Sequence, residues 1–298
     1  MTYTLLRRAL RTALSSREND FSSDPAYEAD EILRILCGRD RASLLLHGSD
    51  SVEDTLADAC LSAAARRADG TPLAYILGKS PFCGHDYFCA PGCLIPRADT
   101  EILVEETVSR LPVNGVLWDL CTGTGCIPCA VLLARREERP GPGFCDASRA
   151  WGVELYDVPL ALAEKNGVSL GLSERFFPCR GDVLAGDCPP DAPSPDIITA
   201  NPPYIPSSVC ETLDSQVKKE PLSALCGGED GLDFYRAILV NYKDRLKPGG
   251  CFLFEIGYDQ GEALRRLSAE HGFPCGIRKD YAGHDRTAIL KKPEGIPS

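Results

Sequence analysis

Four residues of the chain, Asn201-Pro202-Pro203-Tyr204, have the chemistry to hold a flat amino group. They follow the apolar segment 196–200, so we expect a turn at the end of a buried strand. The prolines have no backbone N–H, which leaves the Asn201 side chain and backbone carbonyls as hydrogen-bond acceptors in a stiff turn. Tyr204 adds an aromatic face that can stack on a planar group, with a hydroxyl free for water or a polar partner. The alternative is an ordinary proline turn, and the tetrapeptide alone does not separate the two.

A second candidate site is the loop Asp119-Leu120-Cys121-Thr122-Gly123-Thr124-Gly125. It follows the apolar segment 116–120 and precedes a helical pattern that runs to about Arg135. Gly123 and Gly125 allow a sharp turn and a close approach of the backbone to a ligand. Ligands of open parallel sheets bind at the carboxyl ends of the strands, where this loop is expected. A tight turn without a ligand is the alternative for an isolated Gly-x-Gly.

Acidic residues at the expected strand ends indicate the kind of ligand. Glu154 ends the next strand, where its carboxylate can accept hydrogen bonds from two ribose hydroxyls. Asp182, in Gly181-Asp182-Val183, can accept one from an adenine amino group. The loop lacks the Gly-Lys-Ser/Thr of a phosphate-binding loop, and carboxylates repel phosphate while they suit a sulfonium or an ammonium group. These features favour S-adenosylmethionine as the cofactor.

The pattern along the chain predicts elements that would position these residues. Residues 1 to about 75 read as helices, and one is expected from Asp24-Pro25 to Gly38 and another from 51 to Gly70. We therefore predict an N-terminal helical domain at 1–77, a linker with a short hairpin at 78–97, and a second domain at 98–298. In the second domain helical patterns alternate with short apolar runs, which predicts a mostly parallel sheet. The expected strands are 116–120, 151–154, 176–179, 197–200 and 251–255.

Composition limits the partners and the compartment. The net charge of −11 and the pI near 4.9 disfavour direct binding to nucleic acid, which needs a clustered basic surface. The sequence contains no run of eighteen apolar residues and no secretory signal, so we expect a cytoplasmic protein with no membrane contact. The fifteen cysteines are an odd number and are interpreted as reduced thiols, and no metal site is expected because Cys126-Ile127-Pro128-Cys129 has no second pair of ligands.

These motifs and several others together resemble the HemK-like family, the class I methyltransferases that modify glutamine in peptide chain release factors. Asn-Pro-Pro-Tyr is similar to the turn of adenine and guanine amino-group methyltransferases, whereas Ile-Pro-Arg-x-x-Thr-Glu resembles the glutamine enzymes in particular. The sequence departs from the usual family pattern in two places: Cys121 stands where a glycine is usual, and Leu155-Tyr156-Asp157-Val158-Pro159 differs from the usual Asp-x-Ser-Pro-x-Ala. The resemblance covers nearly the whole chain and rests on the segments 94–101, 119–125, 201–204, 220–225, 246–250 and 280–286.

The resemblance implies a Rossmann-like, S-adenosylmethionine-dependent domain with a seven-stranded, mostly parallel sheet, preceded by a helical domain that helps to bind the release factor. It implies an enzyme, expected as a monomer, that methylates the glutamine of a Gly-Gly-Gln loop. Arg97 and Glu101 either form a surface ion pair at a helix start or shape the site. The expected cofactor-binding residues are Asp119, Cys121, Thr122, Gly123, Thr124, Gly125, Glu154, Asp182, Val183 and Asn201, and the expected substrate-binding residues are Arg97, Asn201, Pro202, Pro203 and Tyr204.

The expected catalytic residues are Asn201, Pro202 and Tyr204. The Asn201 side-chain oxygen and the Pro202 carbonyl would accept the two N–H bonds of the glutamine amide, while Tyr204 packs on its plane. Three other functions stay open: a glutamine methyltransferase for a ribosomal protein, an amino-group methyltransferase for a nucleic acid base, and a non-catalytic cofactor-binding module. The net charge disfavours the nucleic acid enzyme, and the intact acceptors of the turn disfavour the non-catalytic module.

Overall fold

The computed structural model describes residues 1–15, 24–137, 146–214 and 216–294, and the chain forms two compact units. Unit 1 comprises Met1–Ser80, Cys89–Pro91 and Asp214–Lys219, and unit 2 comprises Pro81–Phe88, Gly92–Leu213 and Glu220–Ser298. The domain bounds expected from the sequence, at residues 77 and 97, stay a prediction. None of the helices in the described parts of the chain is both long and apolar enough to span a membrane.

Unit 1 is helical, as the sequence predicts. The start of α2 is fixed by Asp24, whose side chain accepts a hydrogen bond from the Ala26 backbone N–H at 2.8 Å, and Pro25 occupies the first turn. Gly38 ends this helix in the left-handed conformation, with φ of 62°. The helices of unit 1 are α1 (Tyr3–Ser15), α2 (Pro25–Cys37), α3 (Arg41–His47), α4 (Asp54–Ala68) and α5 (Leu73–Leu77).

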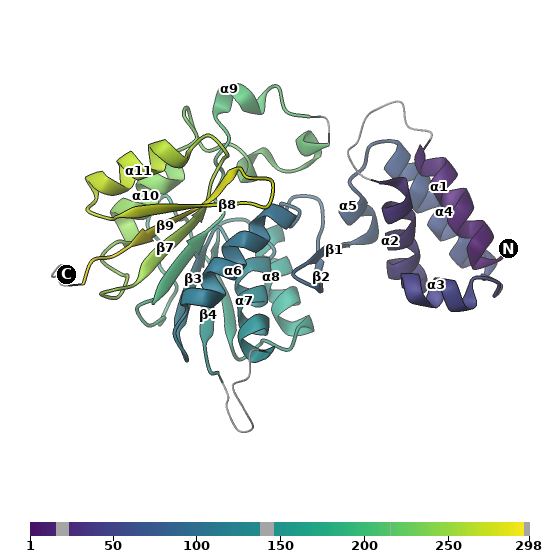
Figure 1. Ribbon diagram of the computed structural model, residues 1–298, viewed down its shortest axis with the longest axis horizontal. Helices are drawn as coiled ribbons and strands as arrows, with labels where there is room; N and C mark the ends of the chain where they lie inside the picture. The colour runs from purple at the N-terminus through teal and green to yellow at the C-terminus, as the bar shows by residue number, and fades with distance from the viewer. Residues whose placement is uncertain (16–23, 138–145, 215, 295–298) are drawn as a thin grey trace. The chain divides into compact units, whose positions relative to one another are not determined.

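The core of unit 1 forms where α1, α2 and α4 pack together (Figure 1). Leu6, Leu10 and Leu14 recur at intervals of four residues on α1, so they lie on one face of the helix and are buried. A buried ion pair joins two helices beside this core, since Arg67 Nε of α4 donates to Glu28 Oε1 of α2 at 2.8 Å.

The short hairpin expected between 78 and 97 is present. Strands β1 (Lys79–Phe82) and β2 (His85–Phe88) form a two-stranded sheet. Both turn residues, Cys83 and Gly84, have positive φ, as a tight two-residue hairpin turn requires.

Unit 2 is built on the expected seven-stranded sheet, with the strand order β5-β4-β3-β6-β7-β9-β8 (Figure 1). Five strands run parallel, and β9 is antiparallel to both of its neighbours. All five strands predicted by residue are present, and three of them have the predicted bounds. The strands are β3 (Val116–Leu120), β4 (Arg149–Glu154), β5 (Phe176–Arg180), β6 (Ile197–Ala200), β7 (Cys251–Glu255), β8 (Cys275–Lys279) and β9 (Asp285–Lys291).

Helices cover both faces of this sheet, and each face has its own apolar core. Successive strand residues point to opposite faces, so Leu117 lies in the core under α6, α7 and α8, and Trp118 lies in the core under α10 and α11. Ile197 and Ile198 of β6 divide in the same way. The helices of unit 2 are α6 (Glu101–Arg110), α7 (Cys126–Glu137), α8 (Asp157–Ser169), α9 (Ser207–Cys210), α10 (Asp233–Tyr242) and α11 (Gly261–Glu270), with the 3₁₀ helices η1 (Ala98–Thr100) and η3 (Leu222–Ala224). The 3₁₀ helix η2 (Val217–Lys219) belongs to unit 1.

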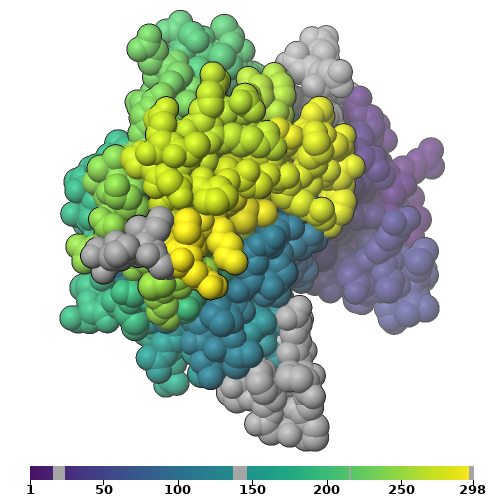
Figure 2. Space-filling model, turned by 60° about the vertical axis from the view of Figure 1, so that its left-hand side comes forward, coloured from purple at the N-terminus to yellow at the C-terminus, as the bar shows by residue number. Residues whose placement is uncertain are grey.

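The last two strands lie against α6 at the surface. In the space-filling view the yellow surface of the C-terminal segment adjoins the blue surface of this helix (Figure 2). Tyr281, in the turn between β8 and β9, donates its hydroxyl hydrogen to Glu105 of α6 at 2.7 Å. The strand order also reverses beside β3, with β4 on one side and β6 on the other. The carboxyl ends of these three strands meet there, which is where open parallel sheets bind ligands.

Candidate active site

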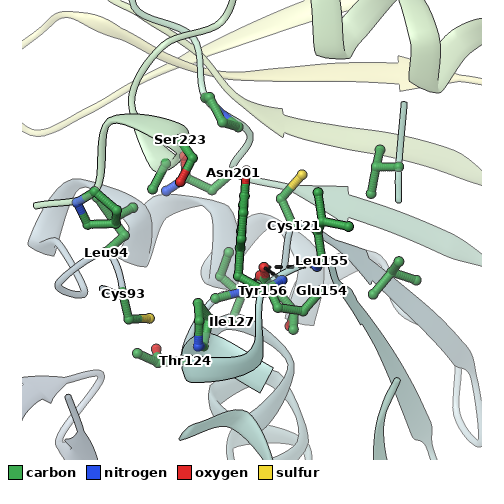
Figure 3. Close-up of a pocket in the computed structure, with 18 of the residues that line it drawn as sticks. Cys93, Leu94, Cys121, Thr124, Ile127, Glu154, Leu155, Tyr156, Asn201 and Ser223 are labelled. Carbon is green, nitrogen blue, oxygen red and sulfur yellow. Dashed lines mark hydrogen bonds between the residues drawn. The ribbon is translucent and has the colours of Figure 1, made fainter. Parts of the chain in front are cut away.

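A pocket opens at the carboxyl ends of β3, β4 and β6, and unit 2 supplies all of its lining residues (Figure 3). Most of the residues predicted from the sequence lie in its wall. Those that line it are Arg97, Cys121, Thr122, Gly123, Thr124, Glu154, Asp182, Val183, Asn201 and Pro203. Those outside the lining are Asp119, Gly125, Pro202 and Tyr204.

The loop between β3 and α7 has three residues with positive φ: Cys121 at 58°, Gly123 at 57° and Gly125 at 74°. A Cβ at Gly123 would meet no other atom within 4 Å, so backbone conformation and not crowding favours glycine there. At Gly125 a Cβ would lie 2.8 Å from the Phe176 ring, so packing also requires glycine. Cys121 takes the left-handed conformation with a side chain, which costs about 1–2 kcal/mol.

Glu154 at the end of β4 joins this loop to the neighbouring strand. Its Oε2 accepts a hydrogen bond from the Gly123 N–H at 2.9 Å, and its Oε1 accepts from the N–H groups of Leu155 and Tyr156 at 2.9 and 3.0 Å (Figure 3). Burial raises the pKa of this carboxyl, while the three N–H bonds oppose the rise. The carboxylate is thereby held in one orientation in the pocket wall.

Asp182 follows β5 and is held by its own turn. Its Oδ1 accepts from the Leu184 N–H, and its own N–H donates to Asp187 Oδ2, both at 2.9 Å. Asp182 and Val183 both line the pocket. The role expected for Asp182, to accept a hydrogen bond from an adenine amino group, stays a prediction.

Asp119 lies behind the pocket wall. It is fully buried, its Oδ2 accepts from the Thr122 hydroxyl, and its Oδ1 accepts from the Thr199 hydroxyl, both at 2.6 Å. Burial raises the pKa of this carboxyl to about 7, against the effect of both hydroxyls. Asp119 therefore joins the loop after β3 to strand β6.

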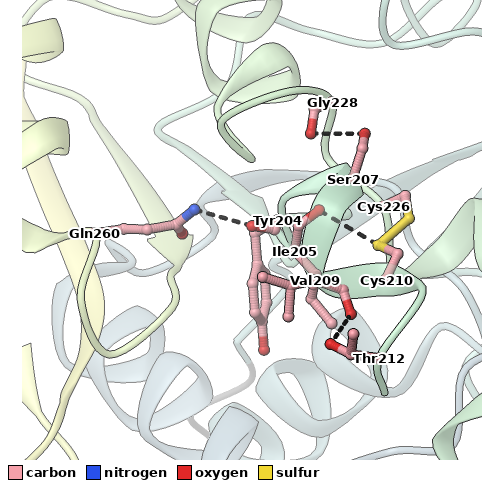
Figure 4. The surroundings of a disulfide bond; sticks show 9 residues. All are labelled: Tyr204, Ile205, Ser207, Val209, Cys210, Thr212, Cys226, Gly228 and Gln260. Carbon is pink, nitrogen blue, oxygen red and sulfur yellow. Dashed lines mark hydrogen bonds between the residues drawn. A yellow bond between two sulfur atoms is a disulfide. The ribbon is translucent and has the colours of Figure 1, made fainter.

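The Asn-Pro-Pro-Tyr turn presents Asn201 to the pocket and directs Tyr204 away from it. Asn201 Nδ2 donates to Thr100 Oγ1 at 3.3 Å, and the Tyr204 hydroxyl donates to Glu255 Oε1 at 3.4 Å. The Tyr204 ring packs against the core beneath α10 and α11, and burial raises the pKa of its hydroxyl. Gln260 Nε2 fixes the backbone by donating to the Tyr204 carbonyl at 2.9 Å (Figure 4).

One of the two expectations for Arg97 and Glu101, a surface ion pair between them, is wrong. Arg97 pairs with Glu220, while Glu101 Oε1 accepts from the Cys83 N–H at 2.7 Å. Glu220 is buried, and its Oε2 also accepts from the Ile95 N–H at 2.9 Å. Glu220 thus joins two segments of the pocket wall, 92–97 and 221–224, and the sequence analysis did not assign it this role.

Glu255 was also missed, although it ends β7 as Glu154 ends β4. The signal used for Glu154, an acidic residue that closes an apolar strand, was available for Glu255 as well. Its side chain is buried beneath the Asn-Pro-Pro-Tyr turn, outside the pocket lining.

The expectation that every cysteine is reduced is wrong for one pair. Cys210 and Cys226 form a disulfide close to the Asn-Pro-Pro-Tyr turn (Figure 4). The backbone places them near each other, because Ile205 and Cys226 form an isolated bridge and α9, which ends at Cys210, follows Pro206. Cysteine counting and compartment rules cannot detect such a local approach.

The fold and the glycine-rich loop beside a strand-end carboxylate are those of the class I methyltransferases. A sequence profile described as the PrmC N-terminal domain matches residues 6–78. The release factor glutamine methyltransferase of Neisseria gonorrhoeae is 37% identical over 90% of this chain and 93% of its own length. That of Moorella thermoacetica is 35% identical over 97% of this chain and 99% of its own. The chain belongs to the release factor glutamine methyltransferase family.

A solved structure of a protein-(glutamine-N5) methyltransferase, described as release factor-specific, from Alicyclobacillus acidocaldarius is 26% identical. It covers 70% of this chain and 99% of its own, with a TM-score of 0.40.

Proposed function

We propose that this chain transfers a methyl group from S-adenosylmethionine to the side-chain amide nitrogen of the glutamine in the Gly-Gly-Gln loop of peptide chain release factors. The observation that carries the proposal is the orientation of Asn201 in the pocket wall. Its Nδ2 is engaged by Thr100 at 3.3 Å, which leaves Oδ1 to accept an N–H bond from a bound amide.

The chemistry of the pocket wall fits the proposed cofactor. Among the described lining residues the acidic side chains are Glu154 and Asp182, and the basic one is Arg97, which Glu220 neutralises. This balance favours a ligand with a sulfonium and an ammonium group over a phosphate. Glu154 would accept the ribose hydroxyls, Asp182 the adenine amino group, and the space beside Gly123 would admit the ligand close to the backbone. When bound, S-adenosylmethionine supplies an electrophilic methyl group.

The proposed task of the protein residues is to orient a weak nucleophile. The lone pair of an amide nitrogen is delocalised into its carbonyl, so the nitrogen must be held with that lone pair facing the methyl donor. Asn201 Oδ1 and the Pro202 carbonyl would accept its two N–H bonds. Orientation of this kind can lower the activation free energy of a bimolecular reaction by about 7–11 kcal/mol. A general base typically raises the rate by a factor of about 10² to 10⁴, which corresponds to only about 3–5 kcal/mol.

Tyr204 has a changed part in this proposal. The Tyr204 ring was expected on the plane of the substrate amide, whereas it packs against the core and its hydroxyl donates to Glu255. We infer that Tyr204 acts chiefly by making the turn rigid, with any contact to the substrate at the edge of its ring.

A transfer assay tests the proposed function. The protein is incubated with labelled S-adenosylmethionine and a purified release factor, beside the same factor with the Gly-Gly-Gln glutamine changed to alanine. We expect label on the first factor and none on the second. Label on the altered factor, or transfer only to a ribosomal protein or nucleic acid, would refute the proposed substrate.

We also propose that the enzyme acts as a monomer in the cytoplasm. Size-exclusion chromatography with light scattering at assay concentration tests the monomer, and fractionation of the producing cells tests the location.

A further inference from the structure

Asn166, on α8, is a fully buried polar residue that joins two segments far apart in the sequence. Its Nδ2 donates to the Thr124 carbonyl at 2.9 Å, in the loop after β3, and to the Phe88 carbonyl at 3.2 Å, at the end of β2. Its Oδ1 accepts from the Phe88 N–H at 2.7 Å. One side-chain amide therefore connects the hairpin to the glycine-rich loop through both its donor and its acceptor.

The carbonyl of Thr124 needs a donor from outside its own helix. In a continued helical turn it would accept from the N–H of residue 128, but that residue is Pro128 and has no N–H. The next carbonyl, that of Gly125, accepts from the Cys129 N–H at 3.1 Å in the usual way. Asn166 thus supplies the hydrogen that the proline lacks.

The peptide group between Thr124 and Gly125 is held at both ends. Its carbonyl accepts from Asn166, and its N–H donates to the Thr122 carbonyl at 2.8 Å. Gly125 has φ of 74° and no Cβ, so its own backbone preferences do not fix the direction of this peptide. Thr122 and Thr124 line the pocket with Gly123 between them (Figure 3). The hydrogen bonds of this one peptide therefore determine the shape of the pocket wall.

The packing around Asn166 holds its side chain against the loop. The Lys165 Nζ, next to it on α8, lies 3.6 Å from the centre of the Phe88 ring. The helix can approach the loop closely because the loop has a glycine at the contact, since a Cβ at Gly125 would lie 3.3 Å from the Ala163 Cα. Asn166 therefore reaches the loop from a rigid element that is packed against it.

We propose that Asn166 is a positioning residue for the cofactor. It selects one direction of the Thr124–Gly125 peptide and so keeps the pocket wall in the shape that binds S-adenosylmethionine. Through the same amide it couples this wall to Phe88, which lies outside the pocket lining. The inference rests on the proposed function only for the identity of the cofactor, and its tests need no release factor.

The dissociation constant for S-adenosylmethionine, measured by calorimetry on the protein alone, tests the positioning role. Asn166→Asp keeps the shape of the side chain, but at pH 8 a carboxylate faces the Thr124 and Phe88 carbonyls with no hydrogen to donate. We expect the dissociation constant to rise about tenfold relative to wild type, the effect of one lost buried hydrogen bond. Asn114→Asp, the same change at an exposed position, is the control and should stay within about twofold of wild type.

Acid should rescue Asn166→Asp, which separates positioning from a general loss of structure. Burial raises the pKa of the introduced carboxyl, opposed by the charge of Lys165, and the protonated form regains an O–H that can donate to the Thr124 carbonyl. The ratio of the variant's dissociation constant to that of the wild type should therefore fall from about tenfold at pH 8 to less than about threefold at pH 5. Asn166→Leu, which regains no donor, should keep a raised ratio at both pH values. An equal ratio for Asn166→Asp at both pH values would overturn the inference and leave the proposed function intact.

A measurement on the wild type alone keeps the inference testable if the variants fold poorly. Hydrogen exchange at single amides, followed by NMR with and without S-adenosylmethionine, reports on the Phe88 N–H that donates to Asn166. We expect the cofactor to slow exchange at Phe88 together with Gly125, because one side chain holds both segments. The control is the Lys292 N–H, which donates to the Gly250 carbonyl just before β7 and should be slowed much less.

The outcomes of the exchange measurement distinguish this inference from the proposed function. Slower exchange at Gly125 with none at Phe88 would refute the coupling and leave the cofactor assignment intact. A wild-type protein that binds no S-adenosylmethionine in calorimetry would refute the proposed cofactor, and this inference with it.

Discussion

Glu220 accepts a hydrogen bond from the Ile95 backbone N–H at 2.9 Å, across 125 residues of sequence. The same carboxylate also pairs with Arg97. Removing the carboxylate therefore leaves the buried Ile95 N–H without its acceptor and Arg97 without its ion-pair partner. We expect Glu220→Ala to lower the free energy of unfolding by about 1–3 kcal/mol and to weaken S-adenosylmethionine binding. Urea denaturation and calorimetry measure the two effects. Arg97→Met is the comparison, with a smaller stability loss because Arg97 is partly exposed. A stable Glu220→Ala protein with normal affinity would contradict this account.

Glu154 should control cofactor affinity more than stability of the fold. In Glu154→Gln the NH₂ group must face one of the N–H donors at Gly123, Leu155 and Tyr156, and the charged acceptor for the ribose is lost. We expect an increase of about 10- to 100-fold in the dissociation constant for S-adenosylmethionine, which corresponds to the loss of one charged hydrogen bond. Calorimetry with Glu164→Gln, an exposed position on α8, provides the control. An affinity equal to wild type would remove Glu154 from the cofactor site.

The left-handed backbone at Cys121 predicts an unusual preference for glycine. Cys121→Gly and Cys121→Ala both lose the thiol, so their difference in unfolding free energy reports on the backbone at φ of 58°. We expect the glycine variant to be the more stable by up to about 1 kcal/mol. At Ala134, within α7, Ala134→Gly should instead lose about 1 kcal/mol. If alanine is favoured at both positions, the strain at Cys121 is not real.

Asp119 and Glu255 predict how stability depends on pH. Burial raises the pKa of both to about 7, so between about pH 4 and 7 the folded protein holds protons that the unfolded chain has released. Their contribution to the free energy of unfolding therefore falls as pH rises through this range, by at most about 1.4 kcal/mol per pH unit for each group. Asp119→Asn should gain stability relative to wild type when urea denaturation is moved from pH 5 to pH 8. A difference independent of pH would show that Asp119 titrates normally.

Because Cys210 and Cys226 form a disulfide, we expect the free energy of unfolding to fall when a reductant is added. A cross-link that closes a loop of this size, with a separation of 16 residues, contributes about 3 kcal/mol in the chain-entropy account. Dithiothreitol should therefore lower the unfolding midpoint of the wild type and leave the Cys210→Ser/Cys226→Ser double variant unchanged. Equal sensitivity in both proteins would place the effect elsewhere.

Local patterns explain why much of unit 2 could be predicted. Strands β3, β6 and β7 are predominantly apolar segments buried on both faces, so their sequences alone mark their bounds. Strand β8 at the sheet edge is different, because it is largely exposed and carries Arg278 and Lys279. No continuous apolar run marks β8, and neither β8 nor β9 was predicted by residue.

The predicted site residues divide in a comparable way. Residues of the loop after β3 and at the strand ends reach the pocket wall because topology alone brings them together. The partner of Arg97 could not be predicted, since Glu220 is 123 residues away and only the folded chain makes it a neighbour. The direction of the Tyr204 side chain depends equally on a distant residue, Glu255.

The side chains of β6 pack into both apolar cores of unit 2, which holds this strand in place. Ile197 and Ile198 are each buried, on opposite faces of the sheet, so this strand cannot slide or rotate without exposing apolar surface on both sides. The start of the Asn-Pro-Pro-Tyr turn is therefore anchored independently of the loops around it. Replacing the surrounding loops with those of a relative should change which protein is recognised and leave the position of the Asn-Pro-Pro-Tyr turn unchanged. Replacing β6 itself would require both layers of helices to repack.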